Sequence, residues 1–418
     1  MAAWSGWAPQ KGLILDGCAG PGGWSWGIKY YLGLRDLGIE WDDAAVATRK
    51  AAKLATRKAD VSTFDLRPYL GRVWGLLFSP PCTLFSDAGT QVGRLMLGIL
   101  AEGVRRLMRG EDCRQEIRDR VYPIALEAQE ARNAKRAEGK RWEQSRVLRA
   151  ARDDAFVACL VLEPARYLYA LLTAPGPVVP FEWAAFEQVP AALPLWEVFA
   201  QELRRLGWSV WTGILNVADY GVGQSRRRAV LIASAVRKVG PPEPTHTEDG
   251  GGEDLFGGFR ARWRTMAETL GWGATDRPSP TVTSGGAKTG GAEPFPTNAR
   301  KALREAYERG AWVLHTNRDQ RPDGSRQTID PYTRPAPTLT SKSGGQWVLK
   351  QPFSADTIRM SVSEAGVLQS FPAGFPWCGG KNKGHEQTGN AVPPLFAAHV
   401  VSVASGVPFL QEALTQAA

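Results

Sequence analysis

A glycine-rich turn between a strand and a helix is the feature that most constrains the fold. The sequence DGCAGPGG at residues 16–23 follows the apolar run GLILDGC at 12–18 and precedes a stretch of helical character. Glycine lets a ligand approach the backbone closely, and a helix N-terminus favours a negative group. The cluster alone is equally consistent with a tight structural turn. A strand, a turn and a helix in this order nevertheless form the basic unit of an α/β sheet.

Further short apolar runs repeat this pattern along the chain. The alternation of strand-like and helix-like stretches predicts an α/β fold with a mainly parallel, doubly wound sheet. The stretches that read as further strands or strand ends are GIEWDD (38–43), ADVSTFD (59–65), VWGLLFSPP (73–81), PVVPFEWAAFEQV (177–189), WSVWTGILNVADYG (208–221) and RRAVLIAS (227–234).

Three side chains stand where the second and third predicted strands end. Glu40 follows the glycine cluster by about twenty residues, where a doubly wound fold places the acid that binds a ribose. Trp41 offers a flat face to a base, and Asp60 could accept a hydrogen bond from an exocyclic amine. Each acid taken singly is also consistent with a solvated loop. Together they predict an adenosine-containing cofactor, and the missing GxGxxG fingerprint argues against NAD.

The stretch FSPPCTLFSDAG at 78–89 stops a predicted strand with two prolines directly before Cys82. Each proline lacks the N–H that a sheet requires. Cys82 is therefore either a small buried residue in a turn or a nucleophile presented at the end of a strand. The cysteines are odd in number and form no CxxC pair, so we expect a reducing compartment without a disulfide framework or zinc site. They are Cys18, Cys82, Cys113, Cys159 and Cys378.

A series of motifs resembles the cytosine-C5 DNA methyltransferase family, nearly end to end and in the family order. DGCAGPGG resembles its cofactor loop, Glu40 its ribose acid and SPPCTLFS (79–86) its nucleophile segment. Later segments continue the resemblance. These are FEQV (186–189), similar to the family's Glu-Asn-Val, NVADYGVGQSRRR (216–228), similar to its Gln-x-Arg-x-Arg, and RPAPTLTS (334–341), LQSFP (368–372) and GNAVPP (389–394), similar to its C-terminal part.

The resemblance implies a Rossmann-like methyltransferase sheet, S-adenosylmethionine as cofactor and double-stranded DNA as partner. Cys82 would attack C6 of a flipped cytosine, and Glu187 would protonate or hydrogen-bond its N3. Arg226 and Arg228 would grip the base, the phosphate or the catalytic loop. The residues expected to bind the cofactor are Asp16, Cys18, Ala19, Gly20, Gly23, Glu40, Trp41, Asp60, Val61, Pro81, Leu160, Asn390 and Val392.

This chain also departs from the family pattern. Thr83 stands where the family usually has Gln, and Gln188 replaces the Asn beside the catalytic Glu. Gln188 keeps the amide but adds a methylene, so we expect its supporting hydrogen bonds to move. The largest departure is the charged segment at 94–152, where the family usually has a short loop.

The domain prediction follows the motifs. The Gly- and Pro-rich region carries a duplicated segment, RPSPTVTS (277–284) and RPAPTLTS, and resembles the family's target recognition domain. We predict a catalytic domain at 1–236 with a helical insertion of one or two helices at 94–152, a target recognition domain at 237–355, and a segment at 356–418 that completes the catalytic domain.

The charge of the chain fits a polyanionic partner without proving one. Fifty-one Lys and Arg oppose 42 Asp and Glu, a formal net charge of +9. For the insertion, two interpretations stay open. It is either a solvated hairpin held by i,i+4 ion pairs, or a set of helices that lays arginines along DNA phosphates. The arginines first considered for that contact are Arg105, Arg106, Arg109 and Arg114.

The remaining expectations concern location and alternative functions. The N-terminus does not read as a signal peptide, and no apolar run reads as long enough to span a bilayer. We therefore expect a monomeric cytoplasmic protein of a bacterial or phage-infected cell, without a membrane or metal partner. An RNA cytosine-C5 methyltransferase and an inactive DNA-binding relative are the alternatives. An adenine N6 methyltransferase is disfavoured because Pro-Pro-Cys replaces its usual Pro-Pro-aromatic segment.

Overall fold

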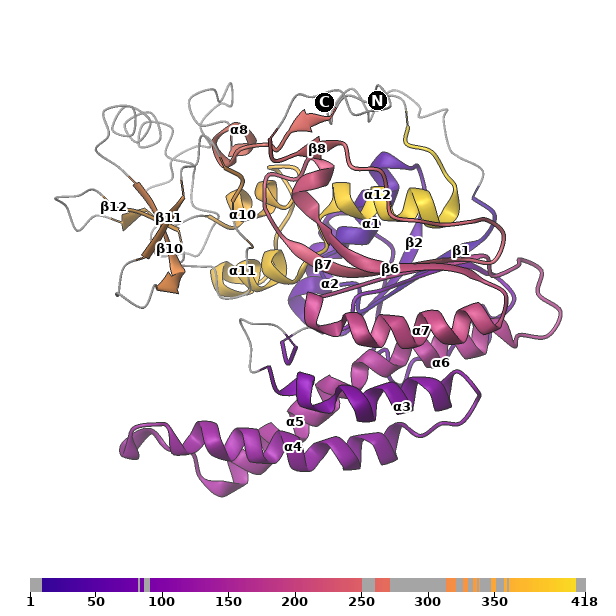
Figure 1. Ribbon diagram of the computed structural model, residues 1–418, viewed down its shortest axis with the longest axis horizontal. Helices are drawn as coiled ribbons and strands as arrows, with labels where there is room; N and C mark the ends of the chain where they lie inside the picture. Colours follow the sequence, from indigo (N-terminus) through magenta and orange to yellow (C-terminus); the bar gives the residue numbers. More distant parts are fainter. Residues whose placement is uncertain are drawn as a thin grey trace.

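A seven-stranded sheet forms the centre of the molecule, with the strand order β3-β2-β1-β4-β5-β7-β6 (Figure 1). The computed structural model describes residues 10–81, 83–85, 91–249, 260–270, 313–320, 326–329, 334–336, 338, 347–350, 357–358 and 361–410. The strands of this sheet are β1 (Leu13–Gly17), β2 (Asp36–Glu40), β3 (Thr56–Lys58), β4 (Val73–Phe78), β5 (Trp183–Gln188), β6 (Ser209–Asn216) and β7 (Arg227–Ser234).

The sheet is mainly parallel. β1 pairs in parallel with β2 and β4, β2 with β3, and β4 with β5, whereas β7 runs antiparallel to both β5 and β6. The predicted α/β fold with a mainly parallel sheet is thus confirmed. The chain winds from β1 outward to β3 and then returns to β4 beside β1, so the order reverses between these two strands. Ligands of such folds bind beside the carboxyl ends of the strands at this point.

Each face of the sheet is covered by helices. Alternate residues of one strand serve opposite faces. Leu15 of β1 belongs to the same buried cluster as Leu100 and Phe199, whereas the adjacent Ile14 belongs to the cluster that contains Trp24 and Phe396. On the second face, α1 (Gly23–Tyr31) lies against α12 (Pro394–Ser405), although the two are far apart in sequence (Figure 1). The first face carries α3 (Leu97–Leu107), α6 (Glu163–Leu172) and α7 (Leu193–Arg205).

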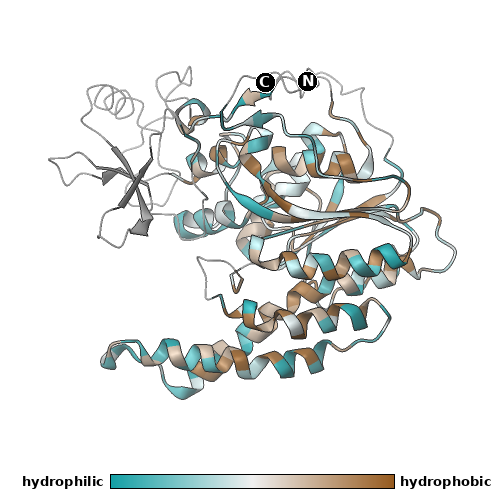
Figure 2. Cartoon of the chain, viewed as in Figure 1, coloured by the Kyte–Doolittle hydropathy of each residue, from teal (hydrophilic) through white to brown (hydrophobic). Residues whose placement is uncertain are grey.

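A helical hairpin projects from the first face. The helices α4 (Arg114–Ala134) and α5 (Gln144–Cys159) pack on each other through Val121, Ala125 and Ala151. The predicted insertion therefore holds α3, α4 and most of α5 rather than one or two helices. Figure 2 shows that the far end of the hairpin is hydrophilic, whereas apolar residues gather where it joins the body.

One helical stretch is long and apolar enough to cross a membrane, so the expectation that none would be is wrong. It runs from Gln144 to Leu172 through α5 and α6, and its most apolar window has a mean hydropathy of 1.5. Of that window, 67% is buried inside the protein, and such burial is typical of a core helix. Burial against the sheet accounts for this hydropathy.

The region predicted for target recognition contains further short elements. Four strands form a second sheet in the order β11-β10-β12-β13. The described part of RPAPTLTS docks beside the Arg226 segment, because Ala336 pairs with Gln224 and its N–H donates to Gly223 O at 3.0 Å. RPSPTVTS lies outside the described residues. The elements within 237–355 are β8 (His246–Thr247), β9 (Ala261–Arg262), α8 (Met266–Leu270), β10 (Val313–Gln320), β11 (Arg326–Ile329) and β12 (Trp347–Lys350). The segment predicted to complete the catalytic domain holds β13 (Thr357–Ile358), which joins the second sheet, and then α10 (Val362–Leu368) and α11 (Gly380–Asn390).

Candidate active site

One cavity of about 350 Å³ lies at the carboxyl ends of the parallel strands. Residues that follow β1, β2, β3 and β4 meet there with residues of β5, β7, the end of α5 and α11. The predicted site residues that line the cavity are Cys18, Gly20, Glu40, Trp41, Asp60, Val61, Pro81, Leu160, Glu187, Arg226, Arg228 and Asn390. The structure thus brings together in one place residues from predicted motifs that are more than 350 positions apart.

The glycine cluster forms a tight turn that exposes its backbone to the cavity. Cys18, Gly20 and Gly22 have φ angles of 57°, 54° and 105°, in the left-handed region. At Gly22 a side chain would also lie 2.4 Å from Leu54 Cδ1, so both conformation and space require glycine there. Gly22 then caps the N-terminus of α1, which directs the first turn of that helix toward the loop.

Glu40 holds this turn from the neighbouring strand. Its Oε2 accepts a hydrogen bond from Gly20 N at 2.7 Å, and its Oε1 accepts from Trp41 N at 2.9 Å and Asp42 N at 2.8 Å. A carboxylate has about four acceptor positions, so about one remains, on Oε2. Burial raises the pKa of Glu40, and the three backbone N–H groups oppose that rise. The carboxylate therefore supports the loop and keeps about one acceptor position at the wall of the cavity.

Arg49 of α2 (Asp43–Ala51) fixes the same loop from behind. Its side chain is fully buried, and its guanidinium donates to Ala19 O at 3.3 Å and Ser25 Oγ at 2.9 Å. It also lies 3.7 Å from Asp36 and 3.9 Å from Asp16. Burial raises the pKa of both carboxyl groups, and the Arg49 charge opposes the rise.

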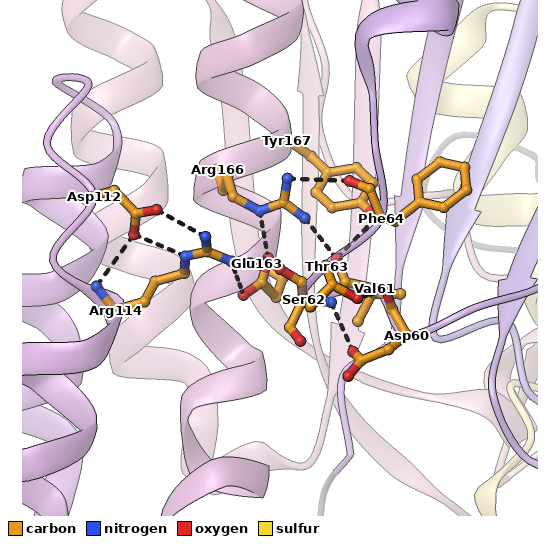
Figure 3. Close-up of polar contacts among 10 residues, drawn as sticks. All are labelled: Asp60, Val61, Ser62, Thr63, Phe64, Asp112, Arg114, Glu163, Arg166 and Tyr167. Atoms are coloured by element: carbon orange, nitrogen blue, oxygen red, sulfur yellow. Dashed lines mark hydrogen bonds and ion pairs between the residues drawn. The ribbon is translucent and has the colours of Figure 1, made fainter.

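Asp60 and Val61 belong to a loop that is held by the helices of the first face (Figure 3). Arg114 of α4 donates to Ser62 O at 2.7 Å and lies 3.1 Å from Glu163 of α6. Arg166 donates to Glu163 at 2.6 Å and to Val61 O at 2.5 Å. The inserted hairpin is therefore fastened directly to the wall of the cavity.

Two further hydrogen bonds fix Asp60 and Val61 in this loop. Asp60 Oδ1 accepts from Ser62 N at 2.8 Å, and Tyr167 donates its hydroxyl to Val61 O at 3.1 Å. Trp41 also lines the cavity, and 60% of its surface is exposed. An exposed aromatic ring beside a hydrogen-bonding loop can bind a flat, polar ring.

The segment around Cys82 is held by Gln188. Its amide nitrogen donates to Pro80 O at 2.9 Å and Pro81 O at 3.3 Å, while its oxygen accepts from Val189 N at 2.7 Å. The longer side chain thus spans from the end of β5 to the double proline. Cys82 itself lies outside the described residues. Pro81 and Thr83, which flank it in sequence, both line the cavity.

A buried ion pair faces the same space. Arg228 of β7 lies 2.7 Å from Glu187 of β5, and each side chain is only 8% exposed. The antiparallel register of β5 and β7 brings the two residues together across adjacent strands. Arg226, also buried, donates to Ala391 O at 3.3 Å and so joins the C-terminal segment to the site.

Four predicted cofactor residues lie outside the cavity lining. Asp16 and Ala19 are buried behind the glycine turn. Gly23 faces Val392 instead, because a side chain at Gly23 would lie 2.0 Å from Val392 O. This close approach packs the C-terminal segment against α1. Asp16 and Ala19 contact Arg49, whereas Gly23 and Val392 pack backbone against backbone.

Several lining residues had no signal in the sequence. Phe156 and Val157 at the end of α5 follow the charged segment 94–152, and neither they nor Lys383 and Gln387 of α11 belong to a recognised motif. Lys383 lies 3.0 Å from Asp42, which fastens α11 over the cavity. A contact between residues 341 positions apart leaves no mark in either local pattern.

Cys18, which lines the cavity, is a poor candidate nucleophile. Burial raises the pKa of its thiol far above the usual value, and the neighbouring Glu40 and Asp16 raise it further. The thiol is therefore protonated, whereas a nucleophilic cysteine requires a thiolate. In the described parts of the chain, no cluster of three or more His, Cys, Asp or Glu residues could hold a metal ion.

The sheet order, the single antiparallel strand β7 and the cavity at the switch point define a Rossmann-like methyltransferase fold. A crystal structure from E. coli, of a prophage-encoded protein described as a DNA modification methyltransferase, has a similar fold. The two share a TM-score of 0.50 at 16% identity over 94% of this chain and 99% of the other.

Sequence comparison identifies the family. The family model for C-5 cytosine-specific DNA methylase matches residues 192–405, and the chain belongs to that family. Type II methyltransferase M1.HphI of Haemophilus parahaemolyticus is 29% identical over 212 residues, 47% of this chain and 48% of the relative. Type II methylase M.HgiDII of Herpetosiphon aurantiacus is 26% identical over 212 residues, 47% of this chain and 55% of the relative. The chain thus spans about half the length of the curated relatives that it matches.

Proposed function

We propose that the protein transfers a methyl group from S-adenosylmethionine to C5 of a cytosine in double-stranded DNA. The observation that carries this proposal is one continuous cavity with two chemically different ends. Glu40, Trp41 and Asp60 follow the outer strands β2 and β3, whereas Glu187 and Arg228 stand on β5 and β7, across the switch point. Such a cavity can hold a nucleoside cofactor and a base side by side.

The cofactor end fits the adenosine part of S-adenosylmethionine. The remaining acceptor position of Glu40 suits a ribose hydroxyl, and the exposed face of Trp41 suits stacking on adenine. Asp60 offers an acceptor for the exocyclic amine. When bound, this cofactor supplies an electrophilic methyl group. We assign Cys18, Gly20, Val61, Pro81, Leu160 and Asn390, which line the same cavity, to its binding.

The base end fits a cytosine that has left the DNA stack. We propose that the Cys82 thiolate adds to C6 and makes C5 nucleophilic, and that Glu187 donates a proton or hydrogen bond at N3. After C5 takes the methyl group, loss of the C5 proton to a base and elimination of the Cys82 thiolate from C6 restore the aromatic ring. Arg228 orients Glu187 through their 2.7 Å ion pair. Gln188, by binding both proline carbonyls, sets the strand end from which Cys82 follows.

The test is replacement of Cys82 with serine. We expect Cys82→Ser to reduce methyl transfer by more than about 10³-fold, because a hydroxyl is a much weaker nucleophile at neutral pH. Cysteine-dependent attack also predicts a covalent adduct of the wild type with duplex DNA that carries 5-fluorocytosine. Transfer is measured with labelled cofactor, and the methylated sequence by methylation-sensitive sequencing of DNA from expressing cells.

Cys378→Ser is the matched control. Cys378 does not line the cavity, so this variant should keep full activity and cofactor binding. Full methyl transfer by Cys82→Ser would remove Cys82 from the mechanism. Transfer by the wild type to RNA but not DNA would move the substrate and leave the chemistry intact.

We also propose that residues 237–355 choose the DNA sequence. The second sheet β11-β10-β12-β13 and the docking of Ala336 beside the Arg226 segment support a separate unit connected to the base end of the cavity. Base edges must be read by groups outside the catalytic sheet. Exchange of this region for that of a relative should change the methylated sequence, and a chimera active at the original site would contradict the assignment.

A further inference from the structure

The positive charge of the inserted helices is concentrated at one end. Residues 131–149, the tip of the α4–α5 hairpin, contain seven Lys and Arg and two Glu, a net charge of +5. The preceding residues 94–130 contain seven of each sign and are neutral overall. More than half of the net +9 of the whole chain therefore lies in the hairpin tip.

Several arginines below the tip form ion pairs within the protein. Arg106 pairs with Glu111 at 2.5 Å and Glu116 at 2.6 Å, and Arg120 lies 2.7 Å from Glu102. Arg114 is held by Asp112 and Glu163. Three of the four arginines first considered for a DNA contact, Arg106, Arg109 and Arg114, are thus occupied by internal ion pairs, that of Arg109 with Glu202 at 3.1 Å.

The tip has the opposite character. Among the residues described, its exposed basic side chains make no ion pair with an acid. They are Lys135, Arg136, Lys140, Arg141, Arg146 and Arg149. A cluster of like charges repels itself, and a polyanion relieves that repulsion.

The tip is also a built structure. Asn133 accepts from Trp142 N at 2.7 Å and donates to Trp142 O at 2.9 Å, which closes the loop between the helices. The guanidinium groups of Arg136 and Arg146 lie 4.0 Å and 4.2 Å from the centroid of the Trp142 ring. These contacts hold the cations in place before any partner binds, which reduces the entropy lost on binding.

The hairpin starts at the active site. Phe156 and Val157 of α5 line the cavity, and α4 begins at Arg114, which binds the cavity loop. Figure 1 shows the hairpin projecting from the body toward the same side as the β10–β13 sheet. Twelve residues of α5 separate Phe156 from Gln144, so the tip lies about 18 Å along the helix from the cavity.

We propose that the tip of the α4–α5 hairpin binds the phosphate backbone of duplex DNA that flanks the target base. This inference rests on the proposed function only for the identity of that base. At roughly 3.4 Å per base pair, the tip reaches phosphates about five base pairs from the target. Because the hairpin tip contacts the DNA backbone rather than base edges, it raises the affinity for DNA without changing the methylated sequence.

The experiment compares two variants of the full chain with four charges removed from each. Lys135, Lys140, Arg141 and Arg149 become Gln in the tip variant, which leaves the Trp142 contacts intact. Arg105, Arg109, Arg204 and Arg205 become Gln in the control. These line a separate cleft between α3 and α7, and α7 ends at the amino edge of the sheet, away from the active site. Both variants lower the net charge equally.

Binding to a labelled 40-base-pair duplex of mixed sequence is measured as a function of salt. The slope of log K against log salt is negative, and each lost phosphate contact reduces its magnitude by about 0.9. Relative to the wild type, we expect the magnitude of the slope to fall by about two to four in the tip variant and by less than about one in the control. On duplexes that contain the methylated sequence, the tip variant should lose the advantage that the wild type gains from flanks longer than about five base pairs.

Several outcomes would contradict the proposal that the hairpin tip binds DNA. An unchanged slope in the tip variant, or equal losses in the two variants, would show a solvated hairpin or a general charge effect. Loss of binding to anionic phospholipid vesicles with unchanged binding to DNA would assign the tip to a membrane. The readout needs no catalysis, so it stands apart from the Cys82→Ser test. If the wild type binds DNA but methylates none, the proposed function fails, and the salt dependence still tests whether the hairpin tip binds DNA.

Discussion

Behind the glycine turn Arg49, Asp16 and Asp36 are buried together, whereas at the hairpin tip Lys140 and Arg141 face solvent. Both regions carry charge, the first directly behind the cavity wall and the second at the far end of the helices that begin there. In the first, the charges contact each other and set the shape of the loop. In the second, they have no acidic partner in the part of the chain that the structure describes. The difference teaches that the location of a charge, not its presence, decides whether it maintains the fold or is available to a partner.

The energetics of the two regions should differ accordingly. A buried charge that loses its partner costs several kcal/mol, because it cannot recover solvation. An exposed charge costs little to remove, because water replaces its environment. Residues between these extremes, such as Glu40 and Arg114, connect the internal network with the cavity and should affect ligand binding more than stability.

The largest effect is expected at Arg49. Arg49→Met should lower the free energy of unfolding by about 3–5 kcal/mol at pH 7, because Asp16 and Asp36 remain buried without a cation. The tip variant, with four charges removed, should stay within about 0.5 kcal/mol of the wild type. Urea unfolding followed by circular dichroism measures both.

The pH dependence checks the cause. Burial already raises the folded-state pKa of Asp36, and loss of Arg49 removes an opposing interaction. A carboxyl group whose pKa is higher in the folded state binds more protons there, so folding gains stability as the pH falls. The deficit of Arg49→Met should therefore shrink below pH 7. A deficit that is constant with pH would assign the loss to packing alone.

A smaller effect is expected at Glu40, which serves both the loop and the cavity. Glu40→Gln can accept through only one oxygen, so it cannot satisfy the three backbone N–H groups and a ribose together. S-adenosylmethionine should bind about 10- to 100-fold more weakly, the equivalent of about 1.5–3 kcal/mol for a charged hydrogen bond. Calorimetry measures the affinity.

Asp43→Asn is the control for Glu40. Asp43 lies three positions away, is 85% exposed and does not line the cavity. Its replacement should leave cofactor affinity unchanged. Equal affinity in wild type and Glu40→Gln would remove Glu40 from the cofactor site and restrict it to holding the turn.

The smallest effect is expected at Arg114, the junction between the hairpin and the cofactor wall. Arg114→Gln loses the contacts to Ser62 O and Glu163, so the loop that carries Asp60 is held less firmly (Figure 3). Cofactor affinity should fall about 3- to 10-fold, near 1 kcal/mol for one hydrogen-bonding unit. The KM for the cofactor should rise while the salt slope of DNA binding stays that of the wild type.

Arg120→Gln separates this role from general helix stability. Arg120 lies on the same helix, but its ion pairs are with Glu102 and Glu116 rather than with the cavity loop. Arg120→Gln should leave the cofactor KM unchanged, and Arg114→Lys should recover part of the loss. If Arg114→Gln and Arg120→Gln behave alike, the hairpin acts through stability and not through the loop.

Much of the site could be predicted because the motifs stand at strand ends. Glu40 and Glu187 stand at or near the ends of apolar strands and Asp60 follows the short strand β3, and parallel strands bring their carboxyl ends to one edge of the sheet. The prediction was weaker where a residue supports another. Asp16 and Gly23 share motifs with residues of the cavity wall, yet one is buried behind the turn and the other packs on Val392. A motif does not show which of its side chains face outward.

The sequence by itself determined the order of strands and helices, the tight turn at Gly22 and the stop before Cys82, because apolar periodicity, glycine and proline act on the backbone within a few residues. Only the tertiary structure decided that Arg49 lies inside the protein, that Arg106 is paired and that the exposed cations of the hairpin tip have no acidic partner among the described residues. The reason is physical. An arginine has the same charge everywhere, and the desolvation and partners that fix its role come from segments that are distant in the chain.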